Sequence, residues 1–296
     1  GKILVGGNFT TYQGLSAGRI IRLNSDGTID TSFNIGTGFN NYVNVIKSFL
    51  NSNMSGTFIS ILVGGAFTSY NGTTQNRITI LNQDGTRYTN FNIGTGFNDN
   101  VNTIDLIKGK AGENVIIIGG AFTSYSGVTQ NRICALERYG SIYEYIDFGT
   151  GFNNTVNTIK SFYYGREILY NVRLLIGGAF TSYNGTTQDN ITRLKEYYPN
   201  EFIIDESFIQ SEYNSNYINN IELLLDNTLL ICGDFTQIIQ PQQSLIYSGT
   251  VYKKPNNNII NIDIQPFVKD SFTIENIFFN EIYNYYLNKI KKYNVE

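Results

Sequence analysis

One twelve-residue segment recurs along this chain at almost constant spacing. GGAFTSYNGTTQ occupies residues 64–75 and again 177–188, and GGAFTSYSGVTQ occupies residues 119–130 between them. The first residue of the glycine pair recurs in steps of 58, 55, 58 and 55 residues, at Gly6, Gly64, Gly119, Gly177 and, in a fifth copy, at the equivalent residue Cys232. A fixed period of this size is the signature of a repeat architecture, so the repeat constrains the fold more than any other feature.

Two further markers follow the same period. The string GTGF ends at Phe39, Phe97 and Phe152. The string V-N-x-I begins at Val43, Val101 and Val156, and reappears as INNI at 218–221 and IENI at 274–277. Because these markers run through the whole sequence, we predict a single domain over residues 1–296.

Each unit is predicted to contain four β-strands. The first begins at V-N-x-I, the second is the apolar run that ends in the glycine pair, the third is a segment such as RITIL, and the fourth surrounds T-x-F-N. Asn82-Gln83-Asp84-Gly85 separates the third from the fourth, and Asp-Gly there predicts a primed hairpin turn. Short strands joined by Gly-rich turns are typical of a propeller blade, so we predict an all-β fold, a β-propeller of five four-stranded blades.

The two ends of the sequence predict how the ring closes. The sequence opens on a second strand at 3–5 and finishes with a first strand near 274–279 that has no partner. Pairing these two strands would complete a blade and cover exposed edges, giving a closed ring of five blades. An open fragment of a larger ring is the alternative, and the tail at 281–296 fits either a strand or an amphipathic helix.

Composition excludes several classes of function. Charged residues are 15% and the net charge is -3, so we expect no nucleic-acid partner. Histidine is absent, which removes Ser-His and Cys-His catalysis, and we predict no catalytic residue, metal or cofactor. Cys134 and Cys232 lie in apolar runs and are expected to be core thiols. Neither a membrane span nor a signal peptide is visible, so the location stays unknown, with a virion or cell surface as the expectation.

The unit ILVGGAFTSYNGTTQNRITILNQDGT, followed by NFNIGTGF, resembles the delta-60 repeat, a β-propeller repeat family with a similar G-G-x-F, R-I-x-R-L-N, D-G-T and S-F-N-x-G string. The resemblance covers the first three units almost completely and the last two in fragments. It implies a propeller fold and carries no general activity. The glycine pair is also similar to that of kelch repeats, but this chain lacks the kelch tryptophan.

Several repeated residues are candidates either for packing or for binding. A phenylalanine that holds one position in all five units is expected to pack between blades. The tyrosines three residues later either cap the core or present a ring at the propeller face: Tyr12, Tyr70, Tyr125 and Tyr183. The loop residues Asn71 and Asn184 accompany them. A repeated arginine, which is replaced by Asn190 in the fourth unit, either hydrogen-bonds loop carbonyls between blades or binds an anion in the channel: Arg19, Arg77 and Arg132.

Three functions remain open from the sequence. The first is a non-enzymatic structural and protein-interaction module, part of a larger surface or virion assembly, whose partners are other proteins of that assembly. The second is a glycan-binding propeller that uses the tyrosines on surface glycans. The third is a glycoside hydrolase or lyase, which would need two carboxylates from the acids that break the repeat: Asp189, Asp205, Glu206, Glu212 and Asp234.

Overall fold

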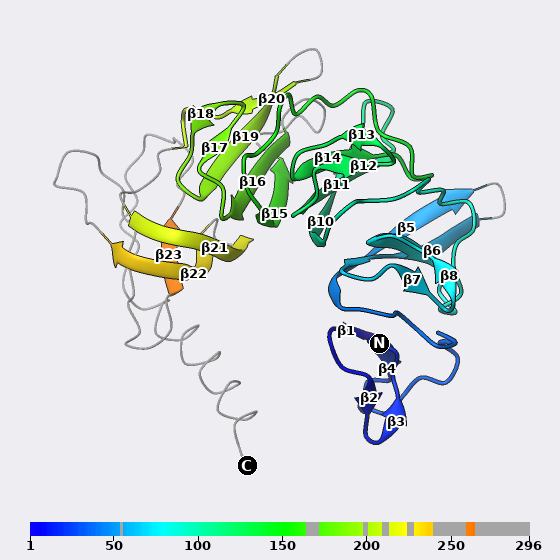
Figure 1. Ribbon diagram of the computed structural model, residues 1–296. Coiled ribbons are helices and arrows are strands. Elements are labelled where there is room, and N and C mark those ends of the chain that lie inside the picture. The colour runs from blue at the N-terminus through cyan, green and yellow to red at the C-terminus, as the bar shows by residue number, and fades with distance from the viewer. Residues whose placement is uncertain are drawn as a thin grey trace, which may run out of the picture. The chain divides into compact units, whose positions relative to one another are not determined.

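The computed structural model describes residues 1–53, 56–163, 172–197, 201–208, 213–223, 228–238 and 259–263, all within one compact unit, Gly1–Asp263. Every regular element in these residues is a β-strand, which confirms the all-β prediction (Figure 1). The strands are β1 (Ile3–Gly6), β2 (Thr11–Tyr12), β3 (Leu15–Ser16), β4 (Ile20–Leu23), β5 (Val43–Asn53), β6 (Gly56–Gly65), β7 (Ser69–Tyr70), β8 (Thr73–Thr74), β9 (Ile78–Leu81), β10 (Val101–Lys108), β11 (Asn114–Gly120), β12 (Ser124–Tyr125), β13 (Val128–Thr129), β14 (Ile133–Leu136), β15 (Val156–Tyr163), β16 (Val172–Gly178), β17 (Ser182–Tyr183), β18 (Thr186–Thr187), β19 (Ile191–Tyr197), β20 (Glu201–Ile204), β21 (Tyr213–Leu223), β22 (Thr228–Ile238) and β23 (Ile259–Asp263).

Each repeat forms its own antiparallel sheet in the predicted strand order. In the second repeat, β5 carries V-N-x-I, β6 ends in the glycine pair, and β9 pairs with the other side of β6. Val43 lies opposite Gly65 and Val45 opposite Gly64, with an irregularity in register between the two valines. The third and fourth repeats show the same irregularity at their V-N-x-I strands. The recurrence of this detail shows that the repeat in sequence is a repeat in structure.

The prediction of four strands in every blade is wrong. The fourth repeat has a four-stranded sheet, β15-β16-β19-β20, whereas the second and third have three strands each in the part of the chain described. There the expected fourth strand is reduced to one bridge, Leu81 to Arg87 or Leu136 to Ile142. In the second repeat the chain then forms a turn, in which the Phe91 amide donates to the Tyr88 carbonyl, and this turn places the Phe91 side chain in the core. Burying this aromatic ring takes the place of continued strand pairing.

Primed turns occur, but not where they were expected. At Asn82–Gly85 only Gly85 has a positive φ, 88°, and its amide donates to the Asn82 carbonyl. This is the three-residue hairpin loop in which a left-handed glycine follows a type I turn. The primed geometry lies instead at Asn71-Gly72, where φ is 44° and 75° and the turn joins β7 to β8. The loop after the repeated tyrosine is thus a small hairpin of its own.

The hydrophobic core lies between successive sheets. One cluster joins Phe33 and Phe39 of the first repeat to Val63, Phe67 and Tyr70 of the second, and equivalent clusters join the second to the third and the third to the fourth. The rings of Phe39 and Phe67 have centroids 4.3 Å apart. Phe122 and Phe180 are fully buried in the equivalent positions, so the repeated phenylalanine packs between neighbouring repeats as predicted in the second, third and fourth repeats. Phe9 is half-buried in a cluster of the first repeat, and the side chain of Phe235 lies outside the described part of the chain.

The glycine pair is required by close packing. A Cβ on Gly64 would lie 2.5 Å from Cγ1 of Val101 in the next sheet, and a Cβ on Gly65 would lie 2.1 Å from the Tyr42 carbonyl oxygen. Cys232 takes the first of these positions in the fifth repeat and is exposed, whereas Cys134 is buried. The expectation that both are core thiols is therefore wrong for Cys232. Its position faces the next sheet in the earlier repeats, and no further sheet is described beyond it.

Two predictions fall outside the described residues. The closing strand near 274–279 and the tail at 281–296 both lie there. The count of five blades, the closure of the ring and the single domain over 1–296 therefore stay predictions.

Candidate functional site

The repeated tyrosines belong to the core. Tyr70, Tyr125 and Tyr183 are at most 2% exposed. Their hydroxyls donate to the carbonyl oxygens of Gly85, Gly140 and Phe202 at 2.5, 2.5 and 2.7 Å. Burial raises the pKa of all three phenols. The structure thus places these rings as caps inside the fold, and none of the three presents a face to solvent.

Tyr12 occupies the same position in the first repeat but is only half-buried. Its hydroxyl donates to the Gly27 carbonyl oxygen at 2.9 Å, which is the same bond to the same turn. In the first three repeats the tyrosine therefore ties the small hairpin to the Gly turn that follows the third strand, whereas in the fourth repeat it ties the hairpin to β20.

Asn71 and Asn184 lie at exposed hairpin tips and hold the preceding repeat. The Asn71 Oδ1 accepts from the Thr37 amide at 3.1 Å, and the Asn71 amide donates to the Gly38 carbonyl. Asn184 Oδ1 accepts from the Gly151 amide and the Thr150 hydroxyl, both at 3.1 Å. Both asparagines have φ between 44° and 49°, which Asn tolerates better than most residues. Their side chains are structural links between repeats that also reach the surface.

The repeated arginines adopt a left-handed backbone conformation. The φ angles of Arg19, Arg77 and Arg132 are 66°, 72° and 69°, and Asn190 has 64° in the fourth repeat. Nη1 of Arg77 and of Arg132 donates to the carbonyl of the alanine after the glycine pair, Ala66 or Ala121. These arginines do bond carbonyls, but the interpretation that the carbonyls link neighbouring blades is wrong for Arg77 and Arg132, because Ala66 and Ala121 belong to the same repeat as the arginine. The replacement by Asn190 is explained by the positive φ, which asparagine accepts.

The asparagine that follows GTGF joins neighbouring repeats, a role that was not predicted from its sequence context. Asn98 Oδ1 accepts from the amides of Thr123 and Ser124 at 2.9 and 3.0 Å, and its Nδ2 donates to the Thr123 hydroxyl at 2.8 Å. Asn40 and Asn153 make the same three bonds in their repeats. The signal was present, because GTGFN is copied three times. Each of these asparagines clamps one repeat to the hairpin of the next.

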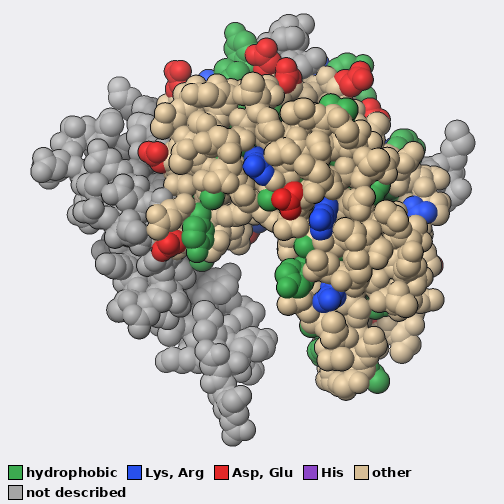
Figure 2. All heavy atoms as spheres, viewed as in Figure 1, with side chains coloured by type: hydrophobic (Ala, Val, Ile, Leu, Met, Phe, Trp, Pro, Cys, Tyr) green, Lys and Arg blue, Asp and Glu red, His purple; other side chains and the backbone are tan. Residues whose placement is uncertain are grey.

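Two surface notches lie at equivalent places above these clamps. Each is lined by the Asn-Arg pair before the third strand, by Thr-Gly-Phe-Asn of the GTGFN segment, and by the Ser and Gly of the next small hairpin. The notch at Arg132 has a volume of about 310 Å³ and that at Arg77 about 390 Å³. Two of the predicted site residues thus line a concave surface, whereas the tyrosines lie beneath it. Figure 2 shows that charged side chains are sparse on the face it displays.

Asp205 is not a departure from the repeat. Arg193 Nε donates to its Oδ2 at 2.9 Å, Arg173 Nε donates to the same oxygen at 3.0 Å, and the Ser207 hydroxyl donates to Oδ1 at 2.7 Å. Burial raises the pKa of Asp205, but the Ser207 bond and the charge of Arg193 outweigh burial, so this pKa lies below its usual value. A carboxylate held in this way is structural.

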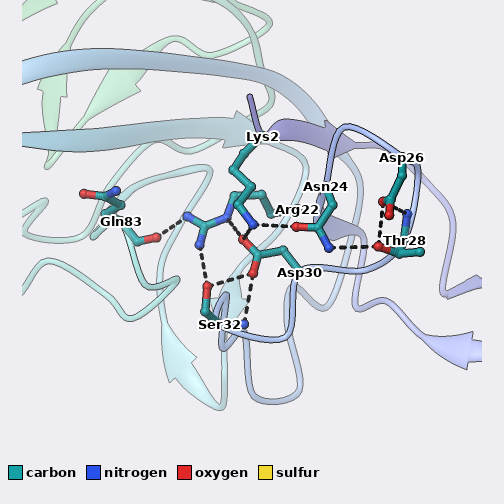
Figure 3. A network of polar contacts seen from close by, with 8 residues as sticks. All are labelled: Lys2, Arg22, Asn24, Asp26, Thr28, Asp30, Ser32 and Gln83. Carbon is teal, nitrogen blue, oxygen red and sulfur yellow. Dashed lines mark hydrogen bonds and ion pairs between the residues drawn. The ribbon is translucent and has the colours of Figure 1, made fainter.

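Asp30 has the same place in the first repeat (Figure 3). Arg22 Nε donates to Asp30 Oδ2 at 2.7 Å, and the Ser32 hydroxyl donates to Oδ1 at 2.7 Å. Nη1 of Arg22 reaches the Gln83 carbonyl of the next repeat. The bond from Ser32, followed by those from Arg22 and Lys2, lowers the pKa of Asp30 in spite of its burial. The first repeat thus has the motif R-x7-D-x-S-F, and the fourth has the same residues with a longer spacing between Arg193 and Asp205. In both repeats the motif forms a buried ion pair.

The other candidate acids are dispersed. Asp189 and Glu206 are exposed, Asp234 accepts a bond from Asn216 Nδ2 at 2.9 Å, and Glu212 lies outside the described residues. Over the ranges that the structure describes, no three His, Cys, Asp or Glu side chains gather where they could hold a metal ion. Within the same ranges no helix is long and apolar enough to cross a membrane.

The V-N-x-I strands carry a row of alternating charges. The residue after this motif is Lys47, Asp105, Lys160 and Glu222 in successive repeats. Lys47 Nζ pairs with Asp105 Oδ1 at 2.6 Å and Lys160 Nζ with Glu222 Oε2 at 2.6 Å. The asparagine of the motif also bonds across repeats, as from Asn102 Nδ2 to the Val156 carbonyl at 3.1 Å. These polar contacts set the order of neighbouring strands and are already satisfied within the protein.

Comparison with known proteins agrees with this architecture. A family model described as "Domain of unknown function (DUF5122) beta-propeller" matches residues 1–33, 60–91, 114–142 and 173–196. No curated protein and no solved structure matches the chain. The matching description does not name the delta-60 repeat, so that narrower resemblance stays a prediction. The matched segments and the all-β sheets together support a β-propeller repeat family for this chain.

Proposed function

We propose that the chain is a non-enzymatic β-propeller that acts as a structural and protein-interaction module in a larger surface or virion assembly. One observation carries the proposal: the notches of about 310 and 390 Å³ repeat with equivalent linings at two successive junctions, beside exposed hairpin tips. Such a periodic surface suits a partner that contacts several repeats at once. The five-bladed ring closed by the terminal strands belongs to the same proposal.

The placement of the other candidates supports this choice among the three functions. Asp205, the most buried of the candidate acids that the structure describes, is held by two arginines and a serine. The stacking of sugars would need exposed rings, and Tyr70, Tyr125 and Tyr183 are at most 2% exposed. An interaction module needs only the exposed tips and notches, which the structure provides.

The proposal is tested in the native source of the protein. An affinity-tagged chain is expected to co-purify in fixed stoichiometry with the proteins of a surface structure or virion. The double variant Val128→Glu/Thr129→Glu changes the two exposed residues of β13, directly beside one hairpin tip, and should reduce incorporation, because it places two charges in the contact surface. Tyr197→Ala, which changes an exposed residue at the end of β19, is the control. A chain that purifies alone, or a tip variant that is incorporated normally, contradicts the proposal.

A further inference from the structure

We propose that the notches at Arg77 and Arg132 are two equivalent carboxylate-binding sites, which together take acidic side chains from a protein partner. The inference deepens the proposed function and rests on it, because it names the chemistry by which the partner is recognised. It is carried by the charge, the geometry and the repetition of the two notches.

Each notch contains a single formal charge, and it is positive. The linings consist of one arginine with Asn, Thr, Ser, Gly and Phe, and contain no carboxylate. In Arg77 and Arg132, the hydrogen bond that the structure shows for the guanidinium uses Nη1 alone, to Ala66 and Ala121. A guanidinium has five N–H donors, so most of them remain available in each notch.

The arginine is positioned before a ligand arrives. Its backbone has a left-handed conformation, and the bond from Nη1 to the alanine carbonyl holds one end of the guanidinium. A planar guanidinium held in this way matches a carboxylate better than a flexible lysine would. Ser124 and Ser182 also line the notches, and a serine hydroxyl can donate a further hydrogen bond from a neutral group.

The first and fourth repeats supply natural controls. Arg19 makes the equivalent bond from Nη1 to the carbonyl of Asn8, but it has two further contacts: Nη1 also donates to Asn8 Oδ1 at 3.3 Å, and the guanidinium lies 6.0 Å from the centre of the Tyr42 ring. Asn190 replaces the arginine in the fourth repeat at φ 64°, and its Nδ2 donates to the Phe180 carbonyl at 3.2 Å. The fold therefore accepts asparagine at this position, so Arg→Asn removes the charge without a new backbone strain.

The two notches differ in one neighbouring charge. Asp99 follows the lining residue Asn98 at the Arg77 notch, whereas Asn154 follows Asn153 at the Arg132 notch. Asp99 is exposed and its negative charge opposes an incoming carboxylate. The Arg132 notch is therefore expected to bind the more tightly.

The test measures the fluorescence anisotropy of labelled poly-L-glutamate at low ionic strength. Arg132→Asn should weaken binding by about tenfold and Arg77→Asn by less, and the double variant by about a hundredfold, because two linked contacts reinforce each other. Arg132→Lys keeps the charge but loses the planar guanidinium, so its affinity should lie between those of the wild type and Arg132→Asn. Arg19→Asn should leave binding unchanged, and thermal unfolding shows that each variant is folded.

Three results would overturn the inference. In the first, the wild-type protein does not bind poly-L-glutamate. In the second, the variant with asparagine at both positions binds as tightly as the wild type. In the third, the protein binds polygalacturonate more tightly than poly-L-glutamate. If any of these occurs while the tagged chain still co-purifies with assembly proteins, the inference fails and the proposed function stands. If both notches bind poly-L-glutamate but the chain purifies alone, the carboxylate sites stand and the assembly role fails.

Discussion

The most informative single residue is the tyrosine of the small hairpin. In Tyr125 the hydroxyl donates to the Gly140 carbonyl at 2.5 Å from a ring that is 2% exposed. Tyr125→Phe keeps the packing but leaves this buried carbonyl without its donor, so we expect a loss of about 1–2 kcal/mol in the free energy of unfolding. Urea denaturation followed by circular dichroism measures it.

Tyr12→Phe is the matched control for that prediction. Tyr12 makes the same bond to Gly27 from a half-buried ring, where water can replace the hydroxyl. Its loss should be clearly smaller. If both variants lose the same stability, burial does not determine the strength of this contact, and the assignment of Tyr125 as a buried cap fails.

At the scale of the element, the sequence predicted local structure best where one conformation or contact permits only one residue type. The glycine pair predicts a strand end in close contact, and Gly64 and Gly65 are found there because their Cβ positions are occupied. The fourth strand was overpredicted, since T-x-F-N has the composition of a strand and its turn depends on the burial of Phe91 between two sheets. The left-handed conformation of Arg77 could not be predicted, because arginine has no preference for positive φ.

The site was only partly predictable for a related reason. Arg77 and Arg132 were correctly expected to bond carbonyls, but the notch beside each depends on how the GTGFN segment of one repeat meets the hairpin of the next. This contact joins segments that are far apart in the chain, and a single sequence does not show which distant segments pack together. Asp205 seemed to break the repeat because the spacing from Arg193 to Asp205 is longer than that from Arg22 to Asp30.

Asp205 gives a prediction of pH dependence for the sheet β15-β16-β19-β20. Because its pKa in the folded protein lies below the unfolded value of about 4, the folded state binds fewer protons than the unfolded state in that range. The stabilisation is therefore complete above about pH 4 and is lost as pH falls through the folded pKa. Asp205→Asn should cost about 3 kcal/mol at neutral pH, since Arg193 and Arg173 lose a buried partner.

Urea unfolding at about pH 7, 5 and 3 checks this sign. The difference between wild type and Asp205→Asn should be largest at the two higher pH values and shrink at the lowest. Asp26→Asn is the control: the Asp26 pKa is also lowered by its bonds to Thr28, but the residue is exposed in a turn, so a smaller loss is expected. A difference that grows toward acid pH would contradict the role assigned to Asp205.

At the scale of the whole molecule, stability depends on the junctions between repeats. No single core fills the described part of the chain: three hydrophobic clusters each span two neighbouring repeats, and another lies within the first repeat. Shared clusters and the asparagine clamps couple each repeat to the next, as nearest-neighbour terms do in other repeat proteins. The chain should therefore unfold cooperatively even though it is built from similar units.

The asparagine clamps test this coupling. Asn40→Ala and Asn153→Ala each remove three hydrogen bonds at an exposed junction, so each should cost about 1 kcal/mol. The two junctions share no residue, so the double variant should show the sum, with an unchanged dependence of the free energy of unfolding on urea. Asn154→Ala removes only local bonds to Thr155 and is the control. A second transition, or different midpoints by circular dichroism and tyrosine fluorescence, would show that the repeats unfold separately and that the junctions do not couple them.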